Sequence, residues 1–177
     1  MIIVFEGPDG FGKTTQALLL AEKLKCAYVK LPNEKIFSGQ ILRKILNKEL
    51  SFEPVSFQAL QIIDKMSSAK EILELEKESG FVILDRFLLS SIAYGRADGL
   101  PADWIEEINS YLLKPDLTFL FEGKSFKLDK DIYGSVEHQK KIAAIYASFD
   151  DPSIVRINAN RDIDVIHEEI VHRVVRK

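Results

Sequence analysis

Cysteine is nearly missing from this sequence, which has only Cys26 among its 177 residues. One cysteine cannot form an internal disulfide, so the sequence fits a reducing compartment and predicts a cytoplasmic location. Apolar runs are also short, and none approaches the roughly 20 residues that a membrane-spanning helix needs. We therefore expect no membrane partner. A secretory leader is not expected either, because no basic segment precedes the short apolar run at the N-terminus.

A surplus of positive charge is missing as well. The 24 lysines and arginines are outnumbered by 27 aspartates and glutamates, which gives a net charge of −3. The composition therefore gives no sign of a nucleic-acid-binding surface, although local groups can still bind small anions. The sequence also has no repeat, low-complexity tract or linker. Its length predicts a single domain over residues 1–177 with a sizeable core.

What the sequence does have is a glycine-rich segment directly after its first apolar run. Residues 7–14 read Gly-Pro-Asp-Gly-Phe-Gly-Lys-Thr and follow the run at residues 1–5. Glycines at this spacing let backbone N–H groups surround phosphates, while the lysine reaches the phosphates and the threonine hydroxyl can bind Mg2+. A glycine turn without a ligand is the alternative. We predict a P-loop that binds a nucleoside triphosphate through Gly7, Pro8, Asp9, Gly10, Phe11, Gly12, Lys13, Thr14 and Thr15.

Apolar strands and amphipathic helices alternate along the rest of the chain. The predicted strands are 2–6, 27–31, 81–85, 116–121 and 153–157. The predicted helices are 13–25, 38–48, 55–79, 101–113, 136–149 and 162–176. The strands are continuous apolar runs, which is typical of strands buried on both faces. The pattern predicts an α/β fold with a parallel sheet between helices.

Residues 123–135 form neither a predicted strand nor a predicted helix. The segment is rich in lysine and aspartate and lies between a strand and a helix. It is either a solvated loop or a short lid that closes over a bound nucleotide and excludes water.

A second group of polar residues, Asp85 and Arg86, follows the third predicted strand. Ligands of an open α/β sheet bind beyond the carboxyl ends of its strands, so Asp85 and Arg86 are expected to face the same crevice as the glycine-rich loop. Asp85 would hold Mg2+ through water, and Arg86 would bind a second phosphate. The alternative is an ion pair between neighbours that only stabilises the fold.

Five segments resemble, in the same order, motifs of the thymidylate kinase family. They are residues 5–16, residues 85–87 with Ser90 and Ala93-Tyr94, residues 114–120, residues 132–133 with 139–142 and Tyr146, and residues 157–160. The resemblance covers nearly the full chain. It implies a P-loop NTPase fold, a three-layer αβα sandwich with a five-stranded parallel sheet and a short lid. It also implies a kinase that transfers the γ-phosphoryl group of ATP, with Mg2+, to dTMP, and a homodimer.

The same resemblance assigns roles to single residues. Lys13 and Arg86 would act in transfer, with Arg86 on the acceptor's phosphate, and Asp9 would meet the 3′-hydroxyl of the deoxyribose. Thr14 and Asp85 would serve the metal. Ala159 would border the adenine. The acceptor site would contain Asp9, Lys65, Arg86, Ser90, Tyr94 and Tyr133.

Several positions depart from the family pattern on the acceptor side. Lys65 stands where the family has an arginine that reads thymine, and Gln61 replaces a stacking aromatic residue. Glu34 occupies the position of an arginine for the acceptor's phosphate. The loop residues Gly10-Phe11 carry no catalytic cation, and the predicted lid offers lysines but no arginine. These departures leave open a kinase for another pyrimidine monophosphate, or a nucleotide-binding regulator with weak or no transfer.

Overall fold

Five parallel strands form one sheet in the computed structural model, which describes residues 1–123 and 135–176. Their order across the sheet is β2-β3-β1-β4-β5. The strands are β1 (Ile2–Glu6), β2 (Ala27–Lys30), β3 (Val82–Asp85), β4 (Leu117–Glu122) and β5 (Ile154–Asn158). Every residue of β1 and β3 is buried, as expected from their continuous apolar runs. The predicted α/β class with a parallel sheet is therefore confirmed.

Helices connect the strands. They are α1 (Lys13–Leu24), α2 (Phe37–Leu46), α3 (Pro54–Ser79), α4 (Leu88–Ala97), α5 (Ala102–Ser110), α6 (Val136–Ser148) and α7 (Ile163–Val175). Six of these match the helices expected from the sequence to within a few residues. The helix α4 was not among them. It is buried along much of its length because it packs against α3, α5 and α6, so it lacks the one-sided apolar pattern of a surface helix.

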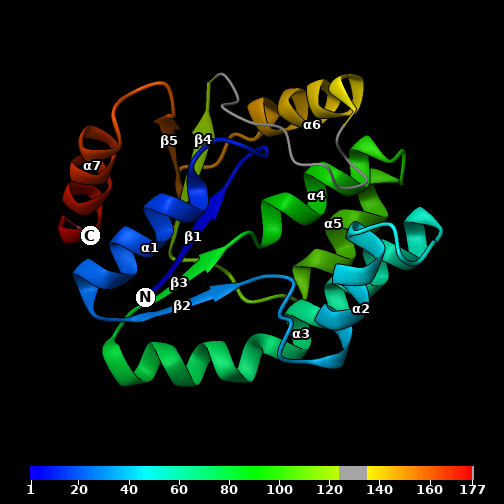
Figure 1. Ribbon diagram of the computed structural model, residues 1–177, viewed down its shortest axis with the longest axis horizontal. Coiled ribbons are helices and arrows are strands. Elements are labelled where there is room, and N and C mark those ends of the chain that lie inside the picture. Colours follow the sequence, from blue (N-terminus) through cyan, green and yellow to red (C-terminus); the bar gives the residue numbers. More distant parts are fainter. Residues whose placement is uncertain (124–134, 177) are drawn as a thin grey trace.

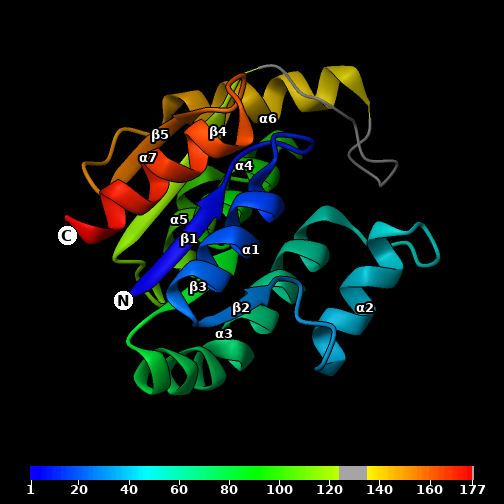
Figure 2. The ribbon, with the colours of Figure 1, turned by 60° about the vertical axis from the view of Figure 1, so that its left-hand side comes forward.

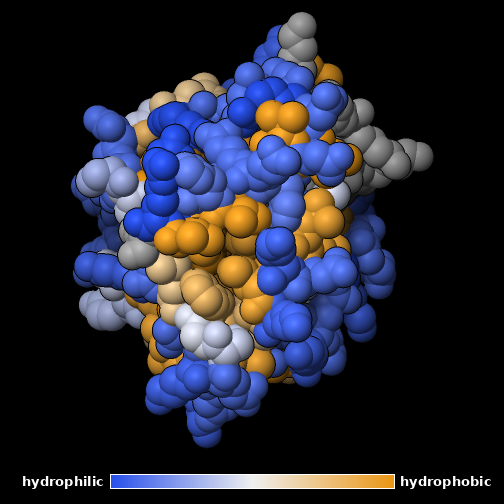
Figure 3. Space-filling view, turned by 90° about the vertical axis from the view of Figure 1, so that its left-hand side faces the viewer, coloured by the Kyte–Doolittle hydropathy of each residue, from blue (hydrophilic) through white to orange (hydrophobic). Residues whose placement is uncertain are grey.

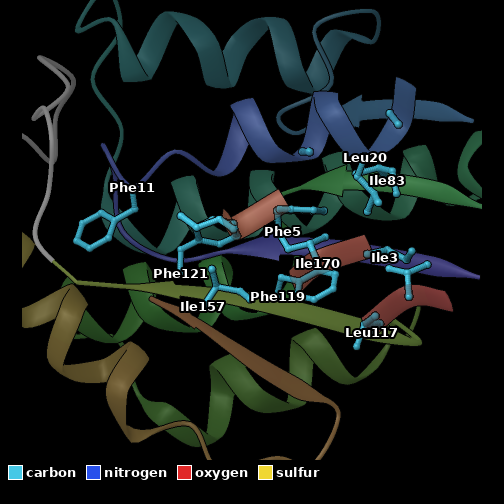
Figure 4. Packing of buried hydrophobic residues seen from close by; sticks show 14 of the residues in the cluster. Ile3, Phe5, Phe11, Leu20, Ile83, Leu117, Phe119, Phe121, Ile157 and Ile170 are labelled. Carbon is cyan, nitrogen blue, oxygen red and sulfur yellow. The ribbon is translucent and has the colours of Figure 1, made fainter. Parts of the chain in front are cut away.

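The helices cover both faces of the sheet (Figures 1 and 2). On one face, α1 and α7 pack against apolar side chains of the strands, and Figure 4 shows this cluster, in which Phe5, Phe119 and Phe121 meet Leu20 and Ile170. On the other face, α3 covers β1, β2 and β3, while α4 and α6 pack beside β4. The result is the predicted three-layer arrangement.

The sheet brings two polar loops to the same edge. β1 and β3 are neighbours, and Phe5 is paired with Asp85 in the parallel register. The loop after β1 and the turn after β3 therefore leave the sheet side by side, at its carboxyl edge. The first loop also passes close to β4, because a Cβ atom on Gly7 would lie only 2.6 Å from the carbonyl oxygen of Phe121. Glycine is required at this position both for space and for its φ of 131°.

Apolar side chains also reach the surface, and Figure 3 shows an apolar area bordered by hydrophilic residues on one face of the molecule. Within the described part of the chain, no helix has the length and apolar character needed to cross a bilayer.

Candidate active site

The glycine-rich loop has the backbone conformation that a phosphate-binding loop needs. Gly7, Gly10 and Gly12 all have positive φ, and helix α1 begins directly after Gly12. Lys13 is buried and donates a hydrogen bond to the carbonyl oxygen of Pro8 at 2.5 Å. Burial lowers the pKa of Lys13 to about 7, and the charge of Arg86 contributes to this shift. The lysine is thus held at the phosphate loop, where an anionic ligand would stabilise its charged form.

Thr14 and Asp85 come together where Mg2+ is expected. The Thr14 hydroxyl donates to Oδ2 of Asp85 at 2.5 Å, and the Tyr28 hydroxyl donates to the same oxygen at 2.9 Å. Hydroxyl and carboxylate oxygens suit Mg2+, which usually keeps several waters and shares its remaining ligands with substrate phosphates. The described residues contain no cluster of three or more histidine, cysteine or acidic side chains that could hold a metal ion. Tyr28 was not among the predicted site residues.

Arg86 lies at the centre of the second polar group. It forms an ion pair with Asp9 through Nη2 and donates to Oγ of Ser90 through Nη1 at 3.0 Å. The guanidinium lies over the ring of Tyr94, 5.1 Å from its centroid, and the Tyr94 hydroxyl donates to Asp9 at 2.8 Å. Burial alone would raise the pKa of Asp9, but the charges of Arg86 and Lys13 outweigh it and hold that pKa below its ordinary value.

A single cavity of about 340 Å³ joins these groups. The loop residues from Asp9 to Thr15 line it, together with residues of α2 and α3. Asp85, Arg86, Ser90 and Tyr94 also line it. The two phosphate-binding loops expected from the sequence therefore face one cavity.

Not every predicted site residue faces this cavity. Lys65 does line it, and burial lowers its pKa to about 8, while its Nζ lies 3.4 Å from Oε1 of Gln61. Ala159 instead is buried in the core cluster that contains Phe11 and Phe121. The expected lid, and Tyr133 within it, fall on residues 124–134, outside the described residues.

Arg43 is a candidate site residue that the sequence reasoning missed. It lies on α2 and lines the cavity, and its Nε donates to Oε1 of Glu34 at 2.8 Å. Glu34 itself is half exposed and lies outside this cavity. Where the family pattern has an arginine at position 34, the structure thus has a glutamate that pairs with an arginine of the cavity wall. No motif in the sequence singled Arg43 out.

Comparison with known proteins decides the family. The thymidylate kinase family model matches residues 5–170. The chain belongs to the thymidylate kinase family. A probable thymidylate kinase of Methanocaldococcus jannaschii is 35% identical, over 97% of this chain and 94% of that protein. The thymidylate kinase of Dictyostelium discoideum is 32% identical, over 96% of this chain and 82% of that protein.

Solved structures agree on the fold. The thymidylate kinase of Candida albicans has a TM-score of 0.85 and 24% identity, covering 98% of this chain and 90% of that one. That of Ehrlichia chaffeensis has a TM-score of 0.81 and 24% identity, with 98% of each chain covered. The P-loop NTPase fold is thereby confirmed. As a member of this kinase family, the protein is a nucleotide-binding phosphotransferase.

Proposed function

We propose that this protein transfers the γ-phosphoryl group of ATP to dTMP. The observation that carries the proposal is the cavity in which the P-loop and the Arg86 group lie together. Phosphoryl transfer needs two nucleotides to be aligned and their negative charge to be neutralised, with little further chemistry from the protein. An oxygen of the acceptor phosphate bonds to the γ-phosphorus while the bond from that phosphorus to the β–γ bridging oxygen breaks, giving ADP and dTDP.

In this mechanism the P-loop binds the donor. Its backbone N–H groups hold the phosphates, and Lys13 turns from the carbonyl oxygen of Pro8 to the transferred group. Thr14 and Asp85 would hold Mg2+, which supplies charge neutralisation at the donor phosphates. The loop adds no cation at Phe11, because phenylalanine is uncharged; this residue belongs to the core cluster that also contains Phe121.

Arg86 binds the acceptor's phosphate in the same proposal. Its guanidinium is already oriented by Asp9 and Ser90, so little ordering is needed when the substrate arrives. Asp9 would meet the sugar hydroxyl, and Tyr94 would line the sugar. Lys65 and Gln61 would lie along the base, where the lysine offers a hydrogen-bond donor to a carbonyl oxygen.

Arg43 adds a second arginine to the acceptor end of the cavity. We expect Arg43→Ala to raise the KM for the acceptor by about tenfold, the usual size of a lost charge-assisted hydrogen bond, while the KM for ATP changes little. Lys44→Ala is the matched control, because Lys44 is exposed on the same helix and does not line the cavity. Equal effects of the two substitutions on the acceptor KM would show that Arg43 does not contact the substrate.

The substrate assignment is tested by assaying nucleoside monophosphates one at a time with ATP and Mg2+, following ADP release. We expect dTMP to give the highest kcat/KM. Preference for another pyrimidine monophosphate would contradict the assignment of the acceptor. ATP binding without turnover of any acceptor would instead indicate a regulator.

We also propose that the protein is a cytoplasmic homodimer. The helix α3 supports a dimer, because Ile63, Met66 and Leu73 are 52%, 51% and 38% exposed on it. Apolar side chains at such spacing form a stripe that a second copy of the helix can cover. Light scattering is expected to give twice the mass of one chain, and Met66→Glu is expected to give a monomer. A monomeric wild-type protein would contradict the dimer.

The lone cysteine supports the proposed cytoplasmic location, because a protein of a reducing compartment has no use for disulfides. Cell fractionation tests this location.

A further inference from the structure

We propose that Glu6 is a positioning residue that holds Arg86 in its substrate-binding orientation. This inference rests on the proposed function, because it takes Arg86 to be the group that binds the acceptor's phosphate. Glu6 is fully buried at the end of β1 and does not line the cavity. It therefore acts on the substrate only through its neighbours.

Both side-chain contacts of Glu6 are with residues that follow Arg86. Its Oε1 accepts the backbone N–H of Phe87 at 2.8 Å, and its Oε2 accepts the hydroxyl of Ser90 at 2.5 Å. The backbone N–H of Arg86 itself donates to the carbonyl oxygen of Phe5 at 3.0 Å. The end of β1 thus holds Arg86, Phe87 and the first turn of α4 in place.

The turn needs such support because Arg86 has a φ of 69°. Side chains other than glycine rarely adopt this left-handed conformation, which costs energy unless the surroundings impose it. The bond from Glu6 to Phe87 fixes the residue directly after the strained position. With the backbone of Arg86 held in this conformation, its guanidinium stays directed toward Asp9 and the cavity.

Glu6 also sets the direction of a chain of hydrogen bonds. Oγ of Ser90 lies 3.0 Å from Nη1 of Arg86 and 2.9 Å from the hydroxyl of Tyr146. A serine hydroxyl has one proton and two lone pairs. Because Ser90 gives its proton to Glu6, both of its lone pairs are left to accept from Arg86 and Tyr146. The hydroxyl protons of Ser90 and Tyr146 then both have an acceptor.

An ionised carboxylate satisfies this arrangement, because it accepts at both oxygens and donates at neither. Burial raises the pKa of Glu6, whereas the hydrogen bonds from Ser90 and Phe87 and the charge of Arg86 favour its ionised form. A glutamine would face either Phe87 or Ser90 with its NH2 group, so one donor in the group would lose its acceptor. Burying a charge is costly, and an apolar side chain could fill this position if its role were only structural. The charge of Glu6 is therefore best explained by its effect on the arginine.

The test is Glu6→Gln, which keeps the size of the side chain. We expect the dissociation constant for dTMP to rise by about tenfold, since one buried hydrogen bond to the charged group is lost. Lys13 and Thr14 form their hydrogen bonds with Pro8 and Asp85 and not with this chain of bonds, so the dissociation constant for ATP should change by less than about twofold. Asp116→Asn is the matched control, because Asp116 accepts the N–H of Ile2 at the other end of β1. It should alter neither affinity.

A double-mutant cycle with Ser90→Ala separates positioning from general destabilisation. Since Glu6 acts on the guanidinium through Ser90, Glu6→Gln should weaken dTMP binding far less when Ser90 is already alanine. Additive losses would overturn the proposal, as would equal losses of dTMP and ATP affinity. If Glu6→Gln alone does not fold, adding Ser90→Ala should restore folding by removing the competing hydroxyl. A double variant that remains unfolded would also overturn it.

Failure of this inference is distinguishable from failure of the proposed function. If wild-type protein binds and phosphorylates dTMP while Glu6→Gln behaves like Asp116→Asn, the kinase assignment stands and Glu6 has no positioning role. If wild-type protein does not bind dTMP, the proposed acceptor is wrong.

Discussion

Replacing Lys13 with methionine is expected to lower kcat by about a thousandfold while the protein stays folded. Removing one preorganised charge contact from a transition state commonly costs two to three orders of magnitude, about 3–4 kcal/mol. Lys13 is the buried ammonium group at the P-loop, and its bond to the carbonyl oxygen of Pro8 can be exchanged for one to a phosphate. Methionine keeps most of the apolar stem, and burying a neutral side chain removes a desolvation cost.

Steady-state kinetics with saturating dTMP and a thermal melt together check this prediction. Lys23→Ala is the control, because Lys23 lies exposed in the last turn of the same helix, away from the cavity. It should leave kcat unchanged. If the Lys13→Met protein turned over at a rate close to wild type, the proposed role of the P-loop in transfer would be wrong.

Replacing Arg86 with lysine is expected to raise the KM for the acceptor by about tenfold to a hundredfold, because each lost hydrogen bond between charged groups is worth about 1.5–3 kcal/mol. Lysine keeps the charge but has no planar fork. It cannot reach Asp9 and Ser90 with two fixed nitrogens and also face a phosphate. The KM for ATP should change by much less, since the P-loop backbone is unaffected.

Kinetics with each substrate varied in turn measure this split. Arg173→Ala serves as the control, because Arg173 is exposed on α7 and its nearest carboxylate oxygen, on Glu169, is 3.9 Å away. An Arg86→Lys enzyme with a normal acceptor KM would mean that the guanidinium only stabilises Asp9. Arg86 would then have a structural role and no contact with the acceptor.

Much of the fold could be predicted from the sequence, because its strands and helices have simple patterns of apolar residues and glycines. The strands β1 and β3 are apolar up to their last residues, Glu6 and Asp85, and the glycines of the first loop mark the change from strand to helix at Lys13. The helix α4 escaped the same reasoning. Its serines, Ser90 and Ser91, are buried like its apolar residues, so neither a polar face nor an apolar face is visible in the sequence.

The candidate site was harder to foresee than the fold. Spacing within one motif indicated that Lys13 and Thr14 belong together, and the topology rule predicted that Arg86 would share their cavity. Glu6 and Arg43 gave no such signal. Their roles depend on contacts across the chain, from Glu6 to Ser90 and from Arg43 to the cavity wall, and these distances exist only after the helices have packed.

Position 34 departs from the pattern of the family. In the sequence alone, a glutamate at position 34 indicates that a contact with the acceptor's phosphate has been lost. In the structure this glutamate instead pairs with Arg43, and the arginine faces the cavity. A guanidinium therefore still lines the cavity. In the proposed mechanism it would bind the acceptor, which favours the kinase over a nucleotide-binding regulator without transfer activity.

The central claim, direct transfer between two nucleotides in one cavity, is tested by following a mixture of ATP, dTMP, Mg2+ and the wild-type protein by 31P NMR. The proposal predicts that ADP and dTDP appear together in equal amounts and that inorganic phosphate stays absent. ADP appearing with inorganic phosphate instead of dTDP, or unchanged ATP in the presence of dTMP, would contradict it.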